Sequence, residues 1–580
     1  MNKNMFKKFA VIFLTAVLIF VFTACDDKPT PTQSPTVNQT ESATVTLGAT
    51  EQPSVEPSQD QTETATATPE ATQAPSETMT QIVEPTATPT VEVTEQITAM
   101  PTESPETTAT QAPSATVTQI ATPTATPALT PTTTPTLAPT ATPTQNNGSK
   151  GLKYIDNGDG TYSVAIGTCI DTEIVIPAYY NGKTVTKIAN NGFSSSNLRT
   201  ITIPNGITSI GNFAFSGCNS LNAITIPNSV TSIGVNAFSG CRNLITITMS
   251  NSVTSIGTWT FGHCNSLRTI TIPNSVTSIG KSAFYDCKSL TEIIIPNSVT
   301  SIGDFAFELC PNLRTITIPS SVTSLGKTLF KDCAGLTQIL VEEGNAKYSS
   351  DGQYVVFNKD KTKIMCVSGA ITTYTIPSNV MSIEEGAFNG CRKLREITIP
   401  SSVTSIGEYA FCACESLGAI NIPSSVTSIG EYAFGSCTNL NTITIPNSVT
   451  SIGRDMFNCC FNLRTITIPN SVTSIEDKAF FNCRGLSTIN IPSSVTSIGV
   501  QAFHSCISLR TIIIPNSVTS IGVVAFDNCT NLHAVYYEGT SEDVFADIQD
   551  NMNSIYYYSE NQPTEAGNYW RYVDGVPTKW

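Results

Sequence analysis

The segment from Leu267 to Ser289 has the sequence L-R-T-I-T-I-P-N-S-V-T-S-I-G-K-S-A-F-Y-D-C-K-S, and the next copy starts at Leu290 with almost the same residues. This 23-residue unit recurs through residues 198–532 of the 580-residue chain. A fixed period of about 20 to 29 residues is typical of a solenoid, in which each repeat adds one rung and packs only on its neighbours. The repeat therefore predicts one long solenoid domain with a repetitive surface.

The spacing of apolar residues within this unit predicts the path of one rung. Alternation around Ile270 and Ile272 favours a short strand with one buried face, and Pro273 ends the strand because proline cannot donate to a strand ladder. A second short extended segment follows, and the three-residue step from Phe284 to Cys287 favours one turn of α-helix or 3₁₀-helix. The side chains expected to point inward are Leu267, Ile270, Ile272, Val276, Ile279, Ala283, Phe284 and Cys287.

The leucine that opens each unit keeps its register with little drift, which predicts continuous columns of stacked side chains. About 14 rungs of 23 residues, spaced ~4.8 Å apart, would build a β-rich core roughly 65 Å long. The leucines recur at Leu198, Leu221, Leu244, Leu267, Leu290, Leu313 and Leu336, and then at Leu394, Leu417, Leu440, Leu463, Leu486, Leu509 and Leu532.

Two segments interrupt this rhythm. Between Leu336 and Leu394 the spacing grows to 58 residues, and the extra sequence at about 341–374 predicts a β-hairpin that turns at Asn358-Lys359-Asp360-Lys361. Near the N-terminal end of the repeats, N-G-D-G at 157–160 and N-G at 181–182 predict two further hairpin turns. We therefore expect an N-terminal cap and first rung at 149–197, the solenoid at 198–534 and a C-terminal cap or tail at 535–580.

The first 25 residues are typical of an export signal. Three lysines precede the apolar run Phe9–Phe22, whose 14 residues are short for a membrane span but suit a signal peptide. Small residues then lead directly to Cys25, as in a bacterial lipobox, although Phe22 stands where leucine is usual. Cys25 is therefore the candidate lipidation site, and an ordinary cleaved signal is the alternative.

Residues 26–148 have the composition of a disordered Thr/Pro-rich linker. From 26 to 147 the chain has no Phe, Tyr, Trp or further Cys, so it cannot bury enough apolar surface to offset its chain entropy. Proline-rich chains are extended, and this one is long enough to carry a domain through a cell wall or envelope. The chain has a net charge of −15, most of it in this linker, and the repeats lack a basic stripe. These features argue against nucleic acid as a partner.

The motif I-P-x-S-V-T-S-I-G-x-x-A-F-x-x-C-x-x-L resembles the BspA-type (Treponema pallidum-like) leucine-rich repeats of bacterial surface proteins. The resemblance covers about two-thirds of the chain. It implies a leucine-rich-repeat solenoid on an exported protein at the bacterial cell surface, and the lipid anchor expected at Cys25 would hold that protein at the membrane. It also implies adhesion to host matrix proteins, other cells or polysaccharides. The family has no common enzymatic activity, so the resemblance supplies no catalytic residues and no cofactor.

The polar residues that could carry chemistry do not converge. Thirteen of the 18 cysteines recur once per repeat, and we expect buried structural thiols, because β-carbons one rung apart would lie ~4.8 Å apart rather than the ~3.8 Å usual in disulfides. Some disulfides or a metal site are the alternatives. His263 and His504 lie about ten rungs apart and His533 is near the last rung, so no triad or zinc site can be assembled and we predict no enzyme.

The outward side of the first strand is the candidate binding surface. Its repeated T-x-T rows either reflect the preference of exposed strands for β-branched residues or form a hydroxyl-rich platform for an extracellular protein or polysaccharide. Many weak contacts would then add to avidity. The alternatives are an envelope scaffold without a specific ligand and an ice-binding threonine array. We expect the repeat domain to be monomeric, with candidate ligand-binding residues Thr200, Thr202, Thr269, Thr271, Thr315, Thr317, Thr442, Thr444, Thr465, Thr467, Arg268, Arg314 and Arg464.

Overall fold

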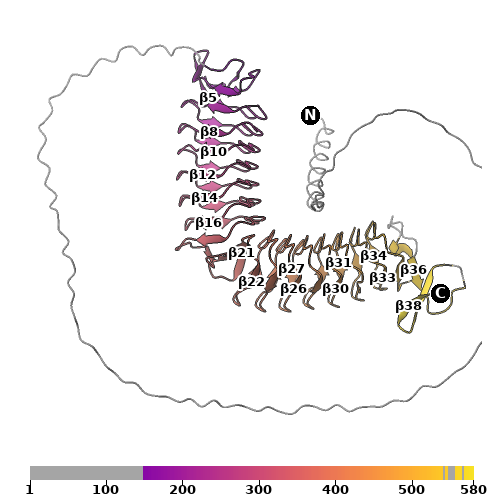
Figure 1. The fold of residues 1–580 in the computed structure, drawn as a ribbon. Coiled ribbons are helices and arrows are strands. Elements are labelled where there is room, and N and C mark those ends of the chain that lie inside the picture. The colour runs from indigo at the N-terminus through magenta and orange to yellow at the C-terminus, as the bar shows by residue number, and fades with distance from the viewer. Residues whose placement is uncertain (1–147, 540–541, 546–554, 565–566) are drawn as a thin grey trace, which may run out of the picture. The chain divides into compact units, whose positions relative to one another are not determined.

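The computed structural model describes residues 148–539, 542–545, 555–564 and 567–580 (Figure 1). The expected signal peptide, Cys25 and nearly all of the expected linker lie outside these residues. The described chain is a β-solenoid of about 17 turns with a spacing of about 23 residues, as the repeat predicted. The turns outnumber the 14 leucine-marked rungs because the expected caps also contribute strands to the stack.

Each rung begins with a short strand, the T-x-T strand, that pairs in parallel with the same strand of a neighbouring rung. In β12 the central Ile270 is buried between two exposed threonines, and it lies beside Ile293 of β14. These strands are β3 (Glu173–Val175), β6 (Thr200–Thr202), β8 (Ala223–Thr225), β10 (Thr246–Thr248), β12 (Thr269–Thr271), β14 (Glu292–Ile294), β16 (Thr315–Ile318), β18 (Gln338–Val341), β22 (Thr373–Thr375), β24 (Glu396–Thr398), β26 (Ala419–Asn421), β28 (Thr442–Thr444), β30 (Thr465–Thr467), β33 (Thr511–Ile514) and β35 (Ala534–Tyr537).

A second strand of two residues, the S-I strand, follows the proline corner and also stacks in parallel. In β13 Ile279 is buried and lies beside Ile302 of β15. These strands are β7 (Ser209–Ile210), β9 (Ser232–Ile233), β11 (Ser255–Ile256), β13 (Ser278–Ile279), β15 (Ser301–Ile302), β17 (Ser324–Leu325), β23 (Ser382–Ile383), β25 (Ser405–Ile406), β27 (Ser428–Ile429), β29 (Ser451–Ile452), β31 (Ser474–Ile475), β32 (Ser497–Ile498) and β34 (Ser520–Ile521).

The helical turn expected between the phenylalanine and the cysteine is wrong. Two residues in each of these segments have left-handed backbone, for example Trp259 (φ 55°) and His263 (φ 60°), and they interrupt a helix before it can propagate. The N–H groups of Trp259, Phe261 and His263 instead donate to carbonyls of the next rung, at 3.0, 2.9 and 2.7 Å. Among the described residues the one 3₁₀-helix, η1 (Glu542–Phe545), lies beyond the repeats.

Stacked phenylalanines and cysteines form the columns of the core. Ring centroids of successive phenylalanines from Phe193 to Phe330, and from Phe388 to Phe526, lie 5.0–6.0 Å apart. The cysteine thiol of one rung donates to the phenylalanine carbonyl of the preceding rung, as Cys287 does to Phe261 at 3.2 Å. Each rung is thus tied to its neighbour by packing and by hydrogen bonds.

The inserted hairpin forms as predicted and separates the core into two clusters. Strands β20 (Val355–Asn358) and β21 (Lys363–Val367) pair antiparallel, and β19 (Tyr348–Ser350) pairs with β20. Val356 packs in the cluster of the preceding rungs, whereas its neighbours Val355 and Phe357 pack in the cluster of the following rungs. Alternate residues of one strand therefore serve two cores, because they point to opposite faces.

Both ends of the stack carry the additional strands expected of caps. At the N-terminal end β1 (Lys153–Asp156) pairs antiparallel with β2 (Tyr162–Ala165), and β4 (Tyr179–Tyr180) pairs antiparallel with β5 (Lys183–Ile188) through the predicted Asn181–Gly182 turn. At the other end β36 (Ile555–Tyr558), β37 (Tyr569–Val573) and β38 (Val576–Lys579) continue the sheet of β33 and β35. Trp570 is fully buried there against Tyr536 and Tyr556.

Candidate functional site

The outward residues of the T-x-T strands form one surface, which we call the T-x-T face. All ten predicted threonines on it are exposed, whereas the residue between each pair is buried. Four of them lie side by side, since Thr442 pairs with Thr465 and Thr444 with Thr467. The others lie beside different residues: Thr269 and Thr271, for example, pair with Glu292 and Ile294.

One run of four outward threonines on this face, as long as the run Thr442, Thr465, Thr488 and Thr511 in the first outward column, was only partly predicted. It lies in the second outward column and consists of Thr202, Thr225, Thr248 and Thr271, one in each of four successive rungs. Thr225 and Thr248 are in register, at Cα partner positions of β8 and β10. Thr225 was missed because Ala223 breaks the T-x-T pattern of its rung, although the period of 23 residues places it in the column.

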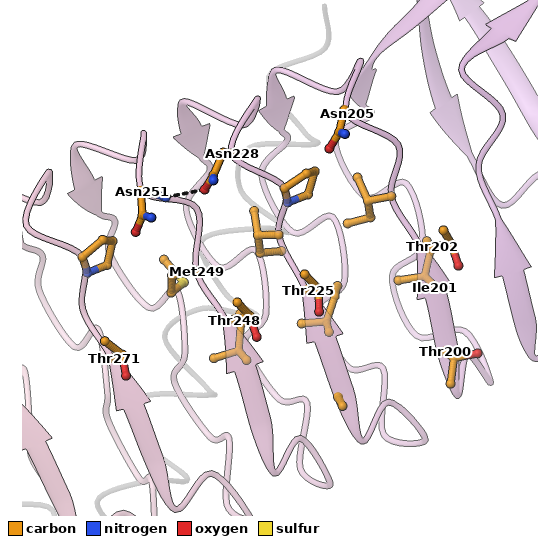
Figure 2. A pocket seen from close by; sticks show the side chains of 17 residues that line it. Thr200, Ile201, Thr202, Asn205, Thr225, Asn228, Thr248, Met249, Asn251 and Thr271 are labelled. Carbon is orange, nitrogen blue, oxygen red and sulfur yellow. Dashed lines mark hydrogen bonds between the residues drawn. The ribbon is translucent and has the colours of Figure 1, made fainter. Parts of the chain in front are cut away.

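This run lines a shallow hollow of about 900 Å³ (Figure 2). Its wall also includes the corner residues Asn205, Asn228 and Asn251, and the Asn251 N–H donates to the Asn228 side-chain oxygen at 3.0 Å. Isoleucines, Met249 and prolines supply its apolar part. The hollow has hydroxyl and amide groups above an apolar base, a mixture suited to a polar polymer that also has carbon faces.

The threonine hydroxyls on this face differ from those beside the S-I strands. Thr277 donates its hydroxyl to the backbone carbonyl of Thr254 at 3.2 Å, and Thr300 donates to Thr277 in the same way. This column, the threonine ladder, also includes Thr208, Thr231, Thr323, Thr404, Thr427, Thr473, Thr496 and Thr519. Within the described ranges, none of the predicted T-x-T hydroxyls has such an intramolecular hydrogen bond.

A serine column resembles the threonine ladder in being satisfied internally. Ser275 donates to the carbonyl of Val253 at 2.6 Å, and Ser298 donates to Val276 at the same distance. The repeat thus uses the serine and the threonine of its S-V-T segment, together with its cysteine, to connect rungs. The T-x-T hydroxyls have no such bond in the described residues and are exposed, whereas several of the serines in the S-I strands, such as Ser278 and Ser301, are half-buried.

The three predicted arginines also lie at this surface. Arg268, Arg314 and Arg464 are exposed, and each immediately precedes the first threonine of a T-x-T strand. Across the described residues the ion pairs involve other cations, such as Arg392 with Asp332 and Arg454 with Asp477. The three guanidinium groups are therefore open to a ligand.

The described cysteines have structural positions in the core and do not come together in one site. The described cysteines are free thiols, and all but Cys412 are buried. Burial raises the pKa of Cys264 and Cys366 to about 12, and it raises the pKa of Cys412 to about 11. A raised pKa keeps these thiols protonated, and the buried Cys264 thiol donates to the Phe238 carbonyl at 3.3 Å.

The histidines have structural partners instead of a shared site. His263 contacts Asp286 at 3.0 Å, and its ring contacts those of Trp259 and Tyr285. The ring of His504 stacks on Phe481, and its side chain is only 15% exposed. In the part of the chain that the structure describes, no three His, Cys, Asp or Glu side chains are placed to hold a metal ion. The same residues include no helix long and apolar enough to cross a membrane.

Comparison with known proteins places this geometry in context. The family model described as the BspA type leucine rich repeat region (6 copies) matches residues 186–287, 260–365, 358–486 and 451–565. No curated protein matches the chain.

Several solved structures are similar to the chain. A leucine rich cell surface protein of Faecalibacterium prausnitzii A2-165 is 30% identical, with a TM-score of 0.50, over 70% of this chain and 99% of that one. A leucine-rich repeat protein of Eubacterium ventriosum is 28% identical, with a TM-score of 0.46, over 66% of this chain and 94% of that one. A leucine-rich repeat protein of Bacteroides ovatus is 26% identical, with a TM-score of 0.38, over 70% of this chain and 98% of that one.

Proposed function

Because the chain belongs to the BspA-type leucine-rich repeat family, we propose that it is a bacterial cell-surface binding or adhesion protein. The solenoid presents its T-x-T face to an extracellular protein or polysaccharide, and it performs no catalysis. The 30% identical protein of F. prausnitzii is itself described as a cell surface protein. Lipidation at Cys25 and the linker over 26–148 would hold the repeat domain at the membrane and extend it outward.

One observation separates the T-x-T hydroxyls from those of the serine column and the threonine ladder. The serine column and the threonine ladder donate to backbone carbonyls of the preceding rung, whereas the T-x-T hydroxyls have no such role in the described residues. A repeated polar group with no role within the fold is free to bind a partner. The regular spacing lets one extended ligand contact many rungs, so that individually weak hydrogen bonds add to avidity.

The alternatives are less well supported by this surface. An ice-binding array needs an uninterrupted lattice of threonines, and Ile294 and Leu340 occupy the second outward column instead. An envelope scaffold without a ligand would leave the hollow beside Thr225 and Thr248 without a purpose. A binding role accounts for both the free hydroxyls and the hollow.

The test compares two sets of threonine-to-valine substitutions, which remove hydroxyl groups but keep a β-branched side chain. The full chain is screened against immobilised matrix proteins and polysaccharides. Substituting the run Thr202, Thr225, Thr248 and Thr271 should abolish capture of a ligand and leave thermal stability nearly unchanged. The matched control substitutes Thr231, Thr254, Thr277 and Thr300.

The control set should give the opposite result. It removes the same number of hydroxyls and loses hydrogen bonds to backbone carbonyls, which are worth about 1 kcal/mol each before discounting for their exposure. We expect lower stability with ligand capture retained at temperatures where the variant is folded. Blank arrays, or full capture by the T-x-T variant, would count against the proposal.

A further inference from the structure

Six exposed arginines occupy one position of the repeat, directly before the T-x-T strand. They are Arg199, Arg268, Arg314, Arg395, Arg464 and Arg510, and we call them the arginine column. No ion pair, side-chain hydrogen bond or ring contact of these side chains occurs within the described ranges. They differ in this from Arg392, which contacts Asp332 and Glu415, and from Arg454, which contacts Asp477.

The arginine column corrects the expectation that the repeats lack a basic stripe, because it gives this edge a charge opposite to that of the whole chain. The chain has a net charge of −15, yet the six column arginines face only three carboxylates on the T-x-T strands, which are Glu173, Glu292 and Glu396. Such a cationic edge attracts anionic ligands, and the acidic remainder of the protein repels them. Its charge is thus complementary to an acidic partner.

The spacing of the arginines limits what kind of acidic partner fits. Arg268 and Arg314 are two rungs apart, and so are Arg464 and Arg510, which corresponds to roughly 10 Å at the usual strand separation. Arg199 is three rungs from Arg268, and Arg395 three rungs from Arg464, so at these two places the matching charges of a polymer would be roughly 14 Å apart. A polysaccharide with one acidic group on alternate sugars repeats its charge at about the length of a disaccharide. Between successive charges such a polymer presents hydroxyl groups to the T-x-T threonines.

We propose that the T-x-T face and the arginine column together bind a linear acidic polysaccharide that carries one carboxylate or sulfate per disaccharide. This inference rests on the proposed function and specifies its ligand class. Guanidinium groups form bidentate hydrogen bonds with carboxylates and sulfates. The free threonine hydroxyls can donate hydrogen bonds to sugar hydroxyls and accept hydrogen bonds from them. The hollow beside Thr225 and Thr248 accommodates the carbon faces of the sugars over its isoleucines.

Two other polyanions fit the surface less well. A nucleic acid has a much denser charge than one arginine per two or three rungs, and the hollow has no aromatic side chain on which a base could stack. An acidic polypeptide carries few hydroxyl groups to match the threonine rows. Both kinds of polymer are therefore used as comparison probes in the test.

The experiment measures binding of the full chain to hyaluronan, which carries one carboxylate per disaccharide. Dextran is the uncharged probe, and polyglutamate and duplex DNA are the other polyanions. We expect hyaluronan to bind tightest at about 50 mM salt and to weaken strongly by about 500 mM, because salt screens exposed charge pairs. Dextran, polyglutamate and DNA should bind at least about tenfold more weakly.

Two matched variants then locate the contact. Arg268→Gln with Arg314→Gln should weaken hyaluronan binding by about tenfold, and adding Arg464→Gln with Arg510→Gln should weaken it further. The control carries Arg242→Gln with Arg484→Gln, which changes the net charge equally at positions outside the column, and it should bind as the parent does. Circular dichroism confirms that each variant is folded.

Different outcomes separate this inference from the proposed function. Equal losses in the control variant, or polyglutamate or DNA binding as tightly as hyaluronan, would overturn the polysaccharide assignment. If hyaluronan fails to bind while the threonine-to-valine variant loses a ligand found on the arrays, the proposed function stands and the acidic polysaccharide is wrong. If neither a charged nor a neutral ligand depends on the T-x-T face, both are wrong.

Discussion

The thiol of Cys437 donates a hydrogen bond to the backbone carbonyl of Phe411, one rung earlier, at 3.1 Å. The same carbonyl also accepts the N–H of Cys414 in its own rung, at 3.2 Å. One oxygen therefore closes the turn of its own rung and connects that rung to the next. Most of the other members repeat the thiol bond to a phenylalanine carbonyl, so the column helps to hold the rungs in register; after the inserted hairpin Cys391 donates to the Ser368 carbonyl instead, at 3.6 Å.

Removing one of these thiols should cost stability without abolishing the fold. Cys437 is fully buried, and Cys437→Ala deletes its sulfur and leaves a small cavity, so we expect a loss of about 1–2 kcal/mol in the free energy of unfolding. Chemical denaturation measures it, and Cys412→Ala, at a partly exposed thiol, is the control. Equal losses at the two positions would contradict a structural role for the column.

Thiol labelling of the folded protein should modify Cys412 first. It is the partly exposed cysteine among the described thiols, and its pKa is raised to about 11, so the reactive thiolate becomes more abundant as the pH rises from 8 towards that value. Labelling with a thiol reagent should therefore accelerate with pH and disappear in Cys412→Ser. Denaturation should then expose the thiols of the cysteine column, and rapid labelling of the column in the folded state would refute its burial.

A methyl group at Gly240 should cost stability through the backbone alone. Gly240 has a left-handed φ of 75°, and a Cβ added there would meet no atom closer than 3.6 Å. Gly240→Ala should therefore lose about 1–2 kcal/mol because L-residues are disfavoured in this region. At Gly418 the φ lies outside the left-handed region and no atom lies within 4 Å, so Gly418→Ala should be neutral or slightly stabilising. Thermal unfolding distinguishes the two, and equal effects would mean that φ is not the cause.

Three glutamates in successive rungs should make stability depend on pH. Burial and then the charges of Glu385 and Glu431 raise the pKa of Glu408. Since the folded pKa is the higher one, this group stabilises the fold below its unfolded pKa, and that contribution is lost as the pH rises through its folded pKa. Glu408→Gln should raise stability at pH 7 by less than about 1 kcal/mol, because the group is largely exposed. High salt should reduce the part of the difference that comes from Glu385 and Glu431, and a difference unchanged by salt would point to burial alone.

Membrane attachment provides a test of the N-terminal prediction. If Cys25 is lipidated, Cys25→Ala should release the protein from the membrane fraction, because the lipid is the proposed anchor. Fractionation of cells that express each form measures this. Unchanged retention of the variant would show that some other element holds the protein.

The sequence predicted the rungs because burial in a repeat is periodic. The stacked columns followed from the spacing of the repeat, and the inserted hairpin followed from the extra sequence and its turn residues. The prediction of a helical turn was wrong because residues such as Tyr409 and Tyr432 have left-handed backbone, and tyrosine is not a residue type that predicts this conformation. A signal was present nevertheless, since glycine occupies the second left-handed position in some rungs, for example at Gly240.

The candidate surface could be predicted in kind but not in detail. Alternation showed that the T-x-T threonines face outward, yet exposure alone could not separate them from the threonine ladder. Thr277 and Thr271 are both exposed threonines in the sequence pattern, and only coordinates reveal that the Thr277 hydroxyl donates to the carbonyl of Thr254. Hydrogen bonds between rungs depend on the distance between backbones, which a residue pattern does not contain.

The β20–β21 hairpin separates the solenoid into two halves that can unfold independently. A stack whose rungs rely only on neighbours tends to unravel progressively once one rung is lost, whether by oxidation of a thiol or by a protease. Here Val356 belongs to one cluster and Val355 to the other. Unfolding that spreads from one side therefore reaches a hairpin that is held by the hydrogen bonds between β20 and β21, and not only by a neighbouring rung. Damage on one side can therefore leave the other half of the solenoid standing, with its share of the T-x-T face still in place.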